Sequence, residues 1–200
     1  MSAARLTAFA ILAAVVVSLF GISTADAGTT IHWQTWWGAA TSSKGTFLLR
    51  STPPVRGSET HSALVTTKRM WGDQTFSVRT TTLSQLRTGA DPNPWEVGWV
   101  LFHFRDLSNY YWFMVKPTGW ELGKKQGSDT QIFLASGTSP TLVVGRQSVV
   151  RIEVRGARIH VSVDGAEVVD YTDPNPLPSG SVGLYEEDSR ASFGSLNFTA

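Results

Sequence analysis

Apolar and polar side chains alternate with a period of two along much of this chain. Val150, Ile152 and Val154 alternate with Arg151, Glu153 and Arg155. A period of two sends successive side chains to opposite faces of a β-strand, whereas a helix needs a period near 3.6. Because the helical period is not sustained anywhere, the chain is expected to consist of strands, each with one apolar face.

Turn signals such as Thr118-Gly119 and Asp164-Gly165 separate these alternating segments. The candidate strands are 46–51, 61–70, 74–83, 97–105, 110–116, 120–125, 131–135, 148–155, 158–164, 167–171, 181–185 and 192–198. Many short strands in one chain must bury their apolar faces against each other. The fold class predicted is therefore all-β, as a two-sheet antiparallel jelly-roll sandwich.

The first residues have the pattern of a secretory signal peptide. Arg5 supplies a positive charge, the stretch from Leu6 to Phe20 is apolar, and Ala25-Asp26-Ala27 is a small-x-small cleavage site. The alternative is a membrane anchor, which needs a span of about 20 residues, longer than this apolar run. We expect residues 1–27 to be removed and residues 28–200 to form one secreted, extracellular domain, with no membrane contact after cleavage.

Composition excludes several classes of partner and site. The chain has no cysteine, so it uses neither disulfides nor thiolate metal sites. The net charge is +1, without a basic cluster, so nucleic acid is not expected as a partner. The 8 tryptophans exceed what a core of this size requires. We expect a monomer.

One predicted hairpin has two chemically different faces. A loop from Asp106 to Asn109 pairs Arg105 with Tyr110, His103 with Trp112, Leu101 with Met114 and Trp99 with Lys116. The opposite face carries hydrocarbon, namely Val100, Phe102, Phe104, Tyr111, Phe113 and Val115. A two-residue turn at Thr118-Gly119 adds Glu121 and Lys125 to the mixed face.

The mixed face suits a glycan if it meets solvent. Aromatic rings stack on the C–H faces of sugars, and charged groups bind hydroxyls or carboxylates. The alternative is that these aromatic side chains only pack across neighbouring strands, where such residues are favoured. We expect Trp99, Trp112, Lys116 and Lys125 to bind a polysaccharide or oligosaccharide.

Several further segments resemble secreted bacterial domains of the concanavalin A-like lectin/glucanase superfamily. They are Asn93 to Trp99, Asn109-Tyr110-Tyr111, Gly119 to Lys124, Arg151 to Val154, Val163-Asp164-Gly165 and Gly180 to Tyr185. Within that superfamily the chain is most similar to laminin-G-like and 3-keto-disaccharide hydrolase-like or family-16-like domains. The resemblance covers His61 to Phe198 and implies two curved sheets, with glycans bound on the concave one.

The resemblance leaves catalysis open, because glucanase members carry Glu-x-Asp-x-x-Glu on one strand. Here the acidic run is Glu186-Glu187-Asp188, without alternation. A polysaccharide lyase needs a cation at the uronate, a base and often a tyrosine acid. His103, Arg105, Tyr110 and Glu121 are the catalytic candidates for a lyase or an atypical glycoside hydrolase.

Other interpretations remain for these residues. His103 also fits a structural histidine of a sheet surface, and Glu121 a simple ion pair with Lys116. A cell-envelope adhesion module is a third interpretation of the whole domain.

One structural calcium ion is the only cofactor that the sequence suggests. Calcium pins loops in many members of the superfamily and takes several oxygen ligands. Asp188 and Glu187 are the candidate ligands, with Asp91, Asn93 and Glu96 as a second group. The alternative is that these are solvated acids of loops.

Overall fold

The computed structural model describes residues 31–56 and 58–199, which form fourteen β-strands. The predicted signal peptide, residues 1–27, lies outside the described residues. The strands are β1 (Trp33–Trp37), β2 (Ala39–Ser43), β3 (Thr46–Arg50), β4 (Ser62–Thr67), β5 (Gln74–Gln85), β6 (Gly98–Asp106), β7 (Asn109–Lys116), β8 (Gly119–Gln126), β9 (Ile132–Gly137), β10 (Ser148–Arg155), β11 (Arg158–Val163), β12 (Ala166–Thr172), β13 (Ser181–Glu187) and β14 (Ser189–Thr199). No helix of the described residues is long and apolar enough to span a membrane.

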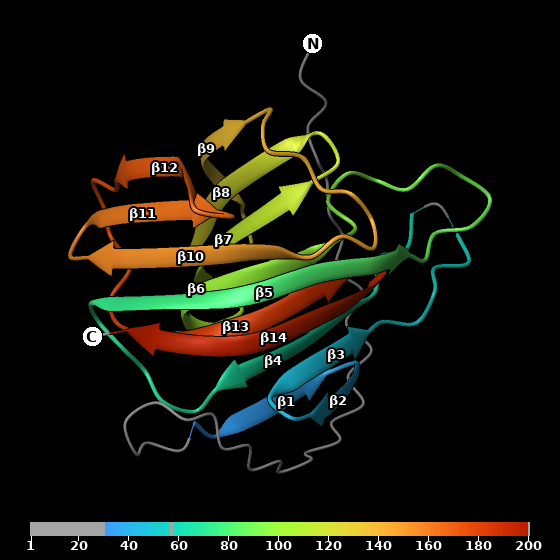
Figure 1. Cartoon of the computed structure of the whole chain (residues 1–200), viewed down its shortest axis with the longest axis horizontal. Coiled ribbons are helices and arrows are strands. Elements are labelled where there is room, and N and C mark those ends of the chain that lie inside the picture. The colour runs from blue at the N-terminus through green and yellow to red at the C-terminus, as the bar shows by residue number, and fades with distance from the viewer. Residues whose placement is uncertain (1–30, 57, 200) are drawn as a thin grey trace.

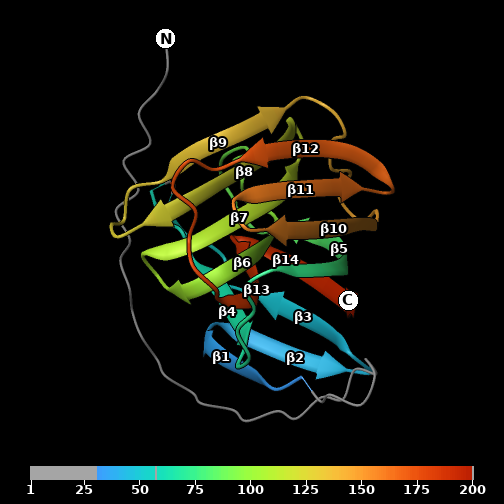
Figure 2. The same ribbon diagram turned by 90° about the vertical axis from the view of Figure 1, so that its left-hand side faces the viewer.

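The strands form two antiparallel sheets that stack as two layers (Figure 1). Sheet I has the order β1-β4-β13-β6-β7-β8-β9, and sheet II has the order β12-β11-β10-β5-β14-β3-β2. Figure 2 shows the two layers from the side. The predicted fold class, an all-β two-sheet sandwich of the jelly-roll type, is confirmed.

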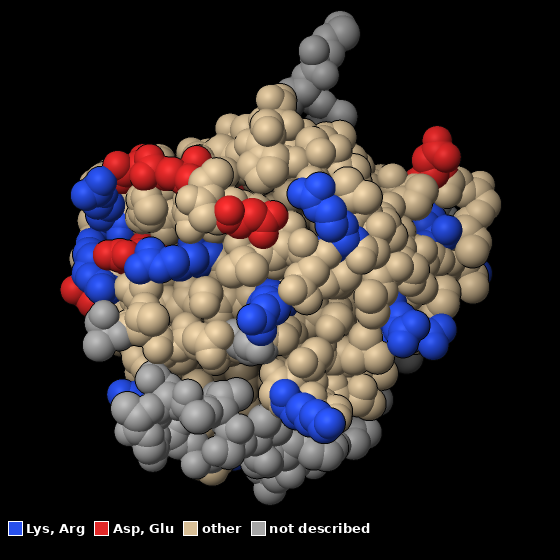
Figure 3. All heavy atoms as spheres, in the orientation of Figure 1, with Lys and Arg blue, Asp and Glu red and all other residues tan. Residues whose placement is uncertain are grey.

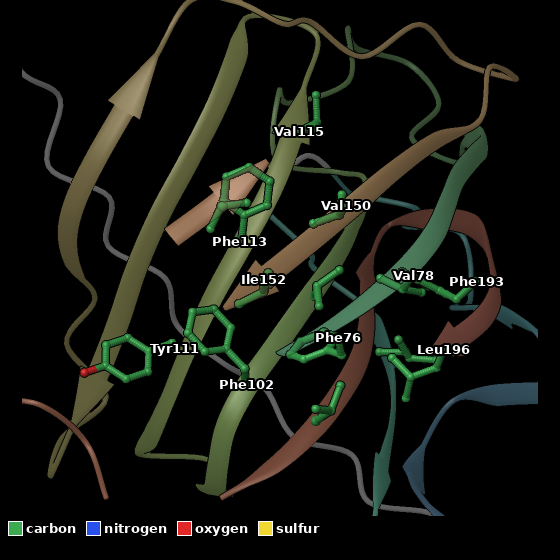
Figure 4. Close-up of a cluster of buried hydrophobic side chains, with 14 of the residues drawn as sticks. Phe76, Val78, Phe102, Tyr111, Phe113, Val115, Val150, Ile152, Phe193 and Leu196 are labelled. Atoms are coloured by element: carbon green, nitrogen blue, oxygen red, sulfur yellow. The ribbon is translucent and has the colours of Figure 1, made fainter. Parts of the chain in front are cut away.

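Apolar side chains from the two sheets meet in the space between them. Phe102, Tyr111 and Phe113 of sheet I face Phe76 and Ile152 of sheet II (Figure 4). Each of these side chains is almost fully buried. Most of this core consists of apolar positions that the period of two had marked, although Trp33 of β1 also belongs to it. Burial of these side chains is the main force that holds the layers together.

The predicted strand boundaries agree closely for the inner strands and fail at one edge of the molecule. The strand predicted at 148–155 has those bounds as β10, whereas β1 and β2 were not predicted. The sequence Trp-Gln-Thr-Trp-Trp of β1 does not alternate, and the strand contains a register shift between Thr35 and Trp37. The segment Ala-Ala-Thr-Ser-Ser of β2 has only small side chains and hence little apolar contrast.

Candidate functional site on the outer face of sheet I

The outer face of sheet I, which points away from the core, carries a second hydrophobic cluster. The strands β6 and β7 send Val100, Phe102 and Phe113 inward and Trp99 and Trp112 outward, as the alternation predicted. The buried members of this outer cluster are Leu64, Val97, Trp99, Leu101, Phe104, Trp112, Met114 and Tyr185. The outer face of a sandwich is usually polar, so a large aromatic cluster there marks this face as unusual.

The predicted exposure of this floor is wrong, because other side chains cover it. Trp112 is 0% exposed and Trp99 is 2% exposed. The partly buried residues that pack against the floor are Trp36, Trp37, Trp95, Leu107, Tyr110 and Leu142. The face therefore has two tiers, a sealed aromatic floor and a partly accessible aromatic rim.

Indole hydrogen bonds hold one side of the rim in place. Trp36 Nε1 donates to Thr66 Oγ1 at 2.9 Å, and Trp37 Nε1 donates to Ser62 Oγ at 2.8 Å. Both acceptors lie on β4, the neighbour of β1. The Trp36 ring meets Phe104 edge-on, with 5.3 Å between ring centroids. These two tryptophans were missed as site residues because β1 was not predicted, although three tryptophans within five residues were a visible signal.

Trp112 is the centre of the floor. A Cβ on Gly123 of β8 would lie 2.2 Å from Cζ2 of Trp112, so the indole lies directly over this glycine. Trp112 Nε1 donates to Glu121 Oε1 at 3.3 Å. Its ring also meets Phe133 of β9, which is 52% exposed. Phe133 therefore extends the aromatic surface from the sealed floor to solvent.

The predicted ion pair between Lys116 and Glu121 is present, with Nζ 2.7 Å from Oε2. The predicted register is shifted by two residues, because the turn is Pro117-Thr118 and Gly119 pairs with Lys116. A shift of two keeps each side chain on its predicted face. Glu121 therefore stays on the outer face and is mostly buried there.

Lys125, predicted on the mixed face, pairs with Tyr110 in the sheet. Its Nζ lies 5.9 Å from the centroid of the Tyr110 ring and 3.6 Å from Asp129 Oδ1. Burial and the negative charges of Glu187 and Asp129 raise the pKa of Tyr110. The phenol of Tyr110 therefore remains protonated at neutral pH and can donate a hydrogen bond.

The prediction that His103 lies on the mixed face is wrong. The register of β6 against β7 shifts between Phe102 and Asp106, and His103 has a positive φ of 46° within this bulge. Its Nδ1 lies 3.1 Å from the carbonyl oxygen of Leu177, and its Nε2 lies 2.8 Å from that of Gly72. His103 is 3% exposed, and its ring links β6 to the segments that contain Gly72 and Leu177.

The same bulge changes the faces and partners of nearby residues. Phe104, predicted in the core, lies on the outer face and stacks with Tyr110 at 5.7 Å between centroids. Leu101 pairs with Trp112, where Met114 had been predicted. Trp99 meets Tyr185 of β13 edge-on at 5.3 Å. Arg105 is exposed close to the β6–β7 turn.

The two predicted calcium ligands have different partners. Glu187 Oε1 accepts a hydrogen bond from the Tyr185 hydroxyl at 2.7 Å, within the outer-face cluster. Asp188 Oδ2 accepts from Arg87 Nη2 at 2.9 Å, and its Oδ1 accepts from the backbone N–H of His61 at 2.8 Å. Among residues 31–56 and 58–199, no three His, Cys, Asp or Glu side chains gather as metal ligands. Calcium binding stays a prediction.

Arg87 organises a buried polar network that the sequence did not reveal. Its Nε donates to Glu96 Oε1 at 2.5 Å, and Asn93 Nδ2 donates to the same oxygen at 2.6 Å. Nearby on β13, burial raises the pKa of Glu186 to about 8. Glu186 Oε2 accepts from the backbone N–H of Ser189 at 2.8 Å. Of the second group of calcium candidates, Asp91, Asn93 and Glu96, the Glu96 carboxylate thus accepts hydrogen bonds from Arg87 and Asn93.

No family model matches the chain, and no curated protein matches its sequence. Solved structures do match it. The carbohydrate-binding module CBM66 from Bacillus subtilis has a TM-score of 0.67 at 19% identity, covering 84% of this chain and 95% of that one. The Bacillus licheniformis β-glucanase has a TM-score of 0.61 at 10% identity, covering 94% of this chain and 100% of the enzyme.

A third match is the exoplasmic/lumenal domain of VIP36 in its Ca²⁺/Man2-bound form. It has a TM-score of 0.59 at 15% identity, covering 83% of this chain and 80% of that one. The chain has the concanavalin A-like lectin/glucanase fold. Identities this low establish the concanavalin A-like fold, whereas function has to be argued from the site.

The acidic residues of the face do not have the spacing of a glycosidase pair. Glu121 lies on β8 and Glu187 on β13, and β6 and β7 separate these strands. Three strand spacings of about 4.8 Å place the two backbones roughly 14 Å apart. Retaining enzymes hold their carboxyl groups about 5.5 Å apart and inverting enzymes at most about 9.5 Å apart. The face offers aromatic stacking and hydrogen bonds more readily than hydrolysis by these two acids.

Proposed function

We propose that the protein is an exported, monomeric glycan-binding domain that holds a polysaccharide along the outer, concave face of sheet I. The observation that carries this proposal is the two-tier aromatic cluster on a sheet face directed away from the core. Its rim residues Trp36, Trp37, Trp95 and Tyr110 are partly accessible, and Phe133 is more than half exposed.

Each tier has its own role in this proposal. The rim rings stack on sugar faces, since an aromatic side chain offers a large flat surface at a low entropic cost. The sealed floor of Trp99 and Trp112 keeps the rim rigid, and rigid sites lose less entropy on binding. Lys116, Glu121 and Lys125 supply donors and acceptors for hydroxyl groups.

The structural neighbours support a glycan as the partner. They include a carbohydrate-binding module, a β-glucanase and a mannose-bound lumenal domain. The enzyme alternatives gain less support. His103, one of the four catalytic candidates, is buried, and both of its ring nitrogens lie within hydrogen-bond distance of backbone carbonyl oxygens. The envelope adhesion alternative predicts protein partners and no affinity for glycans.

The experiment is a glycan microarray of the mature chain, followed by titration of the strongest ligand against single variants. Phe133→Ala and Trp36→Ala should each weaken binding about tenfold or more, which corresponds to about 1.4 kcal/mol. Trp71→Ala is the matched control, because Trp71 is also partly exposed but stacks on Phe198 outside this face. Thermal unfolding of each variant verifies its fold.

The outcomes separate the alternatives. If no glycan binds, or if Phe133→Ala and Trp36→Ala bind like the unmodified protein, the proposed site is wrong. New reducing ends or unsaturated uronates, measured on the same panel, would favour an enzyme.

A further inference from the structure

We infer that the outer face of sheet I selects neutral, hydroxyl-rich glycans over polymers of uronic acids. This inference rests on the proposed glycan-binding function and specifies its substrate class. Two features of the face carry it, the pairing of its lysines with carboxylates and the presence of a further carboxylate, Glu187.

Both lysines of this face lie beside carboxylates. Lys116 Nζ is 2.7 Å from Glu121 Oε2, and Lys125 Nζ is 3.6 Å from Asp129 Oδ1. Glu187 adds a further carboxylate, which accepts a hydrogen bond from the Tyr185 hydroxyl. The described contacts thus place two lysines and three acids on the face. Because each of these two lysines is already paired with a carboxylate, the pairs offer a polyanion little net attraction, and the additional carboxylate repels it.

Burial makes the Lys116–Glu121 pair hard for a charged ligand to break. The side chain of Lys116 is 13% exposed, and that of Glu121 is 5% exposed. A uronate that bound Lys116 would have to displace Glu121 and leave this carboxylate buried without its cation. An uncompensated buried charge is strongly unfavourable, so exchange of one carboxylate for another gains little.

Sugar hydroxyls fit the same pairs without breaking them. A hydroxyl group donates one hydrogen bond and accepts others, so it can bridge an ammonium and a carboxylate. The protonated phenol of Tyr110, beside Lys125, adds a further donor to the face. The rim aromatics contact the C–H faces of neutral sugars without requiring any charge. A neutral glycan can therefore bind these groups without breaking the pairs between lysine and carboxylate.

Besides Arg105 at the β6–β7 turn, exposed arginines lie on the outer face of sheet II. A shallow hollow of about 270 Å³ there is lined by Glu153, Arg155, Arg158 and His160. Weak binding of acidic polymers at these arginines must be distinguished from binding at sheet I. Arg155→Ala together with Arg158→Ala removes this second possibility.

The test compares ligands that differ only in charge. Cello-, laminari- and manno-oligosaccharides are arrayed beside the same oligosaccharides with C6 oxidised to a carboxylate, and the mature chain is titrated at low ionic strength. We expect the oxidised form to bind about tenfold or more weakly than its neutral parent, with the gap narrowing as salt screens the charges.

Carboxylate variants test whether the charges set this preference. Glu121→Gln and Glu187→Gln should each raise the ratio of acidic to neutral affinity several-fold, because each removes one negative charge from the face. Glu153→Gln on sheet II, made together with Arg155→Ala and Arg158→Ala so that these two arginines cannot bind the acidic form, is the matched control and should leave the ratio as it is in the double arginine variant. Thermal unfolding verifies that each variant is folded.

The outcomes distinguish failure of the neutral preference from failure of the proposed glycan-binding function. If no oligosaccharide binds in either form, the proposed function fails. If the oxidised forms bind as tightly as the neutral ones, and still do after Arg155→Ala and Arg158→Ala, the neutral preference is overturned while glycan binding stands. A ratio unaffected by both Gln variants likewise overturns the role of the carboxylates.

Discussion

The outer face of sheet I is packed with aromatic rings, whereas the outer face of sheet II carries exposed pairs of opposite charge. On sheet II, Arg158 forms an ion pair with Asp170 at 2.6 Å, and His160 Nε2 is within hydrogen-bond distance of Glu167 Oε2 at 2.6 Å. Figure 3 shows blue basic and red acidic groups side by side over the part of the molecule that contains β10–β12. Both faces come from strands that alternate in the same way, yet only one of them carries a hydrophobic cluster.

The difference teaches how to separate a structural surface from a functional one. Exposed ion pairs keep a sheet soluble and contribute little to stability. Large aromatic rings on an outward face do not increase solubility as charged pairs do, and exposed aromatic patches commonly mark binding sites. The polar face of sheet II is therefore the internal reference against which the aromatic face of sheet I is tested.

The largest expected effect is the removal of the central indole of the floor. Trp112→Ala should lower the free energy of unfolding by about 3–5 kcal/mol, because it leaves a cavity among packed rings. His160→Ala, on the outer face of sheet II, should change it by less than about 1 kcal/mol. Urea unfolding of both variants measures the contrast, and equal losses would contradict the two-tier description of sheet I.

A pH titration distinguishes the two sides of β13, where Glu187 faces outward and Glu186 is sealed. The pKa of Glu186 is raised to about 8, so the folded protein holds a proton that the unfolded chain releases at lower pH. The free energy of unfolding should therefore fall as pH rises from about 5 to about 8, by up to roughly 1.4 kcal/mol per pH unit.

Urea unfolding at several pH values measures this slope. Glu186→Gln should flatten it, because the amide is neutral at every pH. A slope of the opposite sign in the unmodified protein, or an unchanged slope in the variant, would contradict the assignment.

A pair of glycine substitutions compares the packing of the two outer faces directly. Gly123→Ala should destabilise by about 1–3 kcal/mol, because the new Cβ would lie 2.2 Å from the buried Trp112 ring. Gly194→Ala on β14 places its Cβ 3.2 Å from the Thr46 hydroxyl, which can rotate aside. Its effect should stay within about 0.5 kcal/mol. Thermal unfolding checks whether the two variants separate in this order.

The smallest effect is expected for the exposed charge pair of sheet II. Asp170 has a lowered pKa, chiefly because Arg158 donates hydrogen bonds to it, but both side chains are largely in solvent. Arg158→Ala should leave the melting temperature close to that of the unmodified protein and leave glycan affinity unchanged. A clear loss of affinity in this variant would place the binding site on sheet II.

Most of the fold followed from local pattern, whereas the failure at His103 depends on contacts that are distant in the sequence. The strands β10 and β11 were predicted closely because Val, Ile and charged residues alternate cleanly there. The bulge at His103 could not be predicted, since its positive φ is held by contacts with Gly72 and Leu177. That bulge moved His103 off the face and brought Phe104 onto it.

The candidate site was predicted in position but not in accessibility. Trp112, Glu121, Lys116 and Lys125 do lie on or beside one aromatic face. The rim was missed because Trp36 and Trp37 belong to an irregular edge strand. The calcium candidates were adjacent in sequence, and adjacency gave no information on their partners.

The sequence by itself determined which side chains share a face, because the direction of a side chain along a strand depends on the local backbone alone. Tertiary structure decided which parts of this face are sealed, because the residues that pack against its aromatic cluster come from β1, from the β6–β7 hairpin and from the loops before β6 and after β9. Burial depends on neighbours from distant parts of the chain, so no local pattern could distinguish the sealed aromatic floor of sheet I from a surface open to solvent.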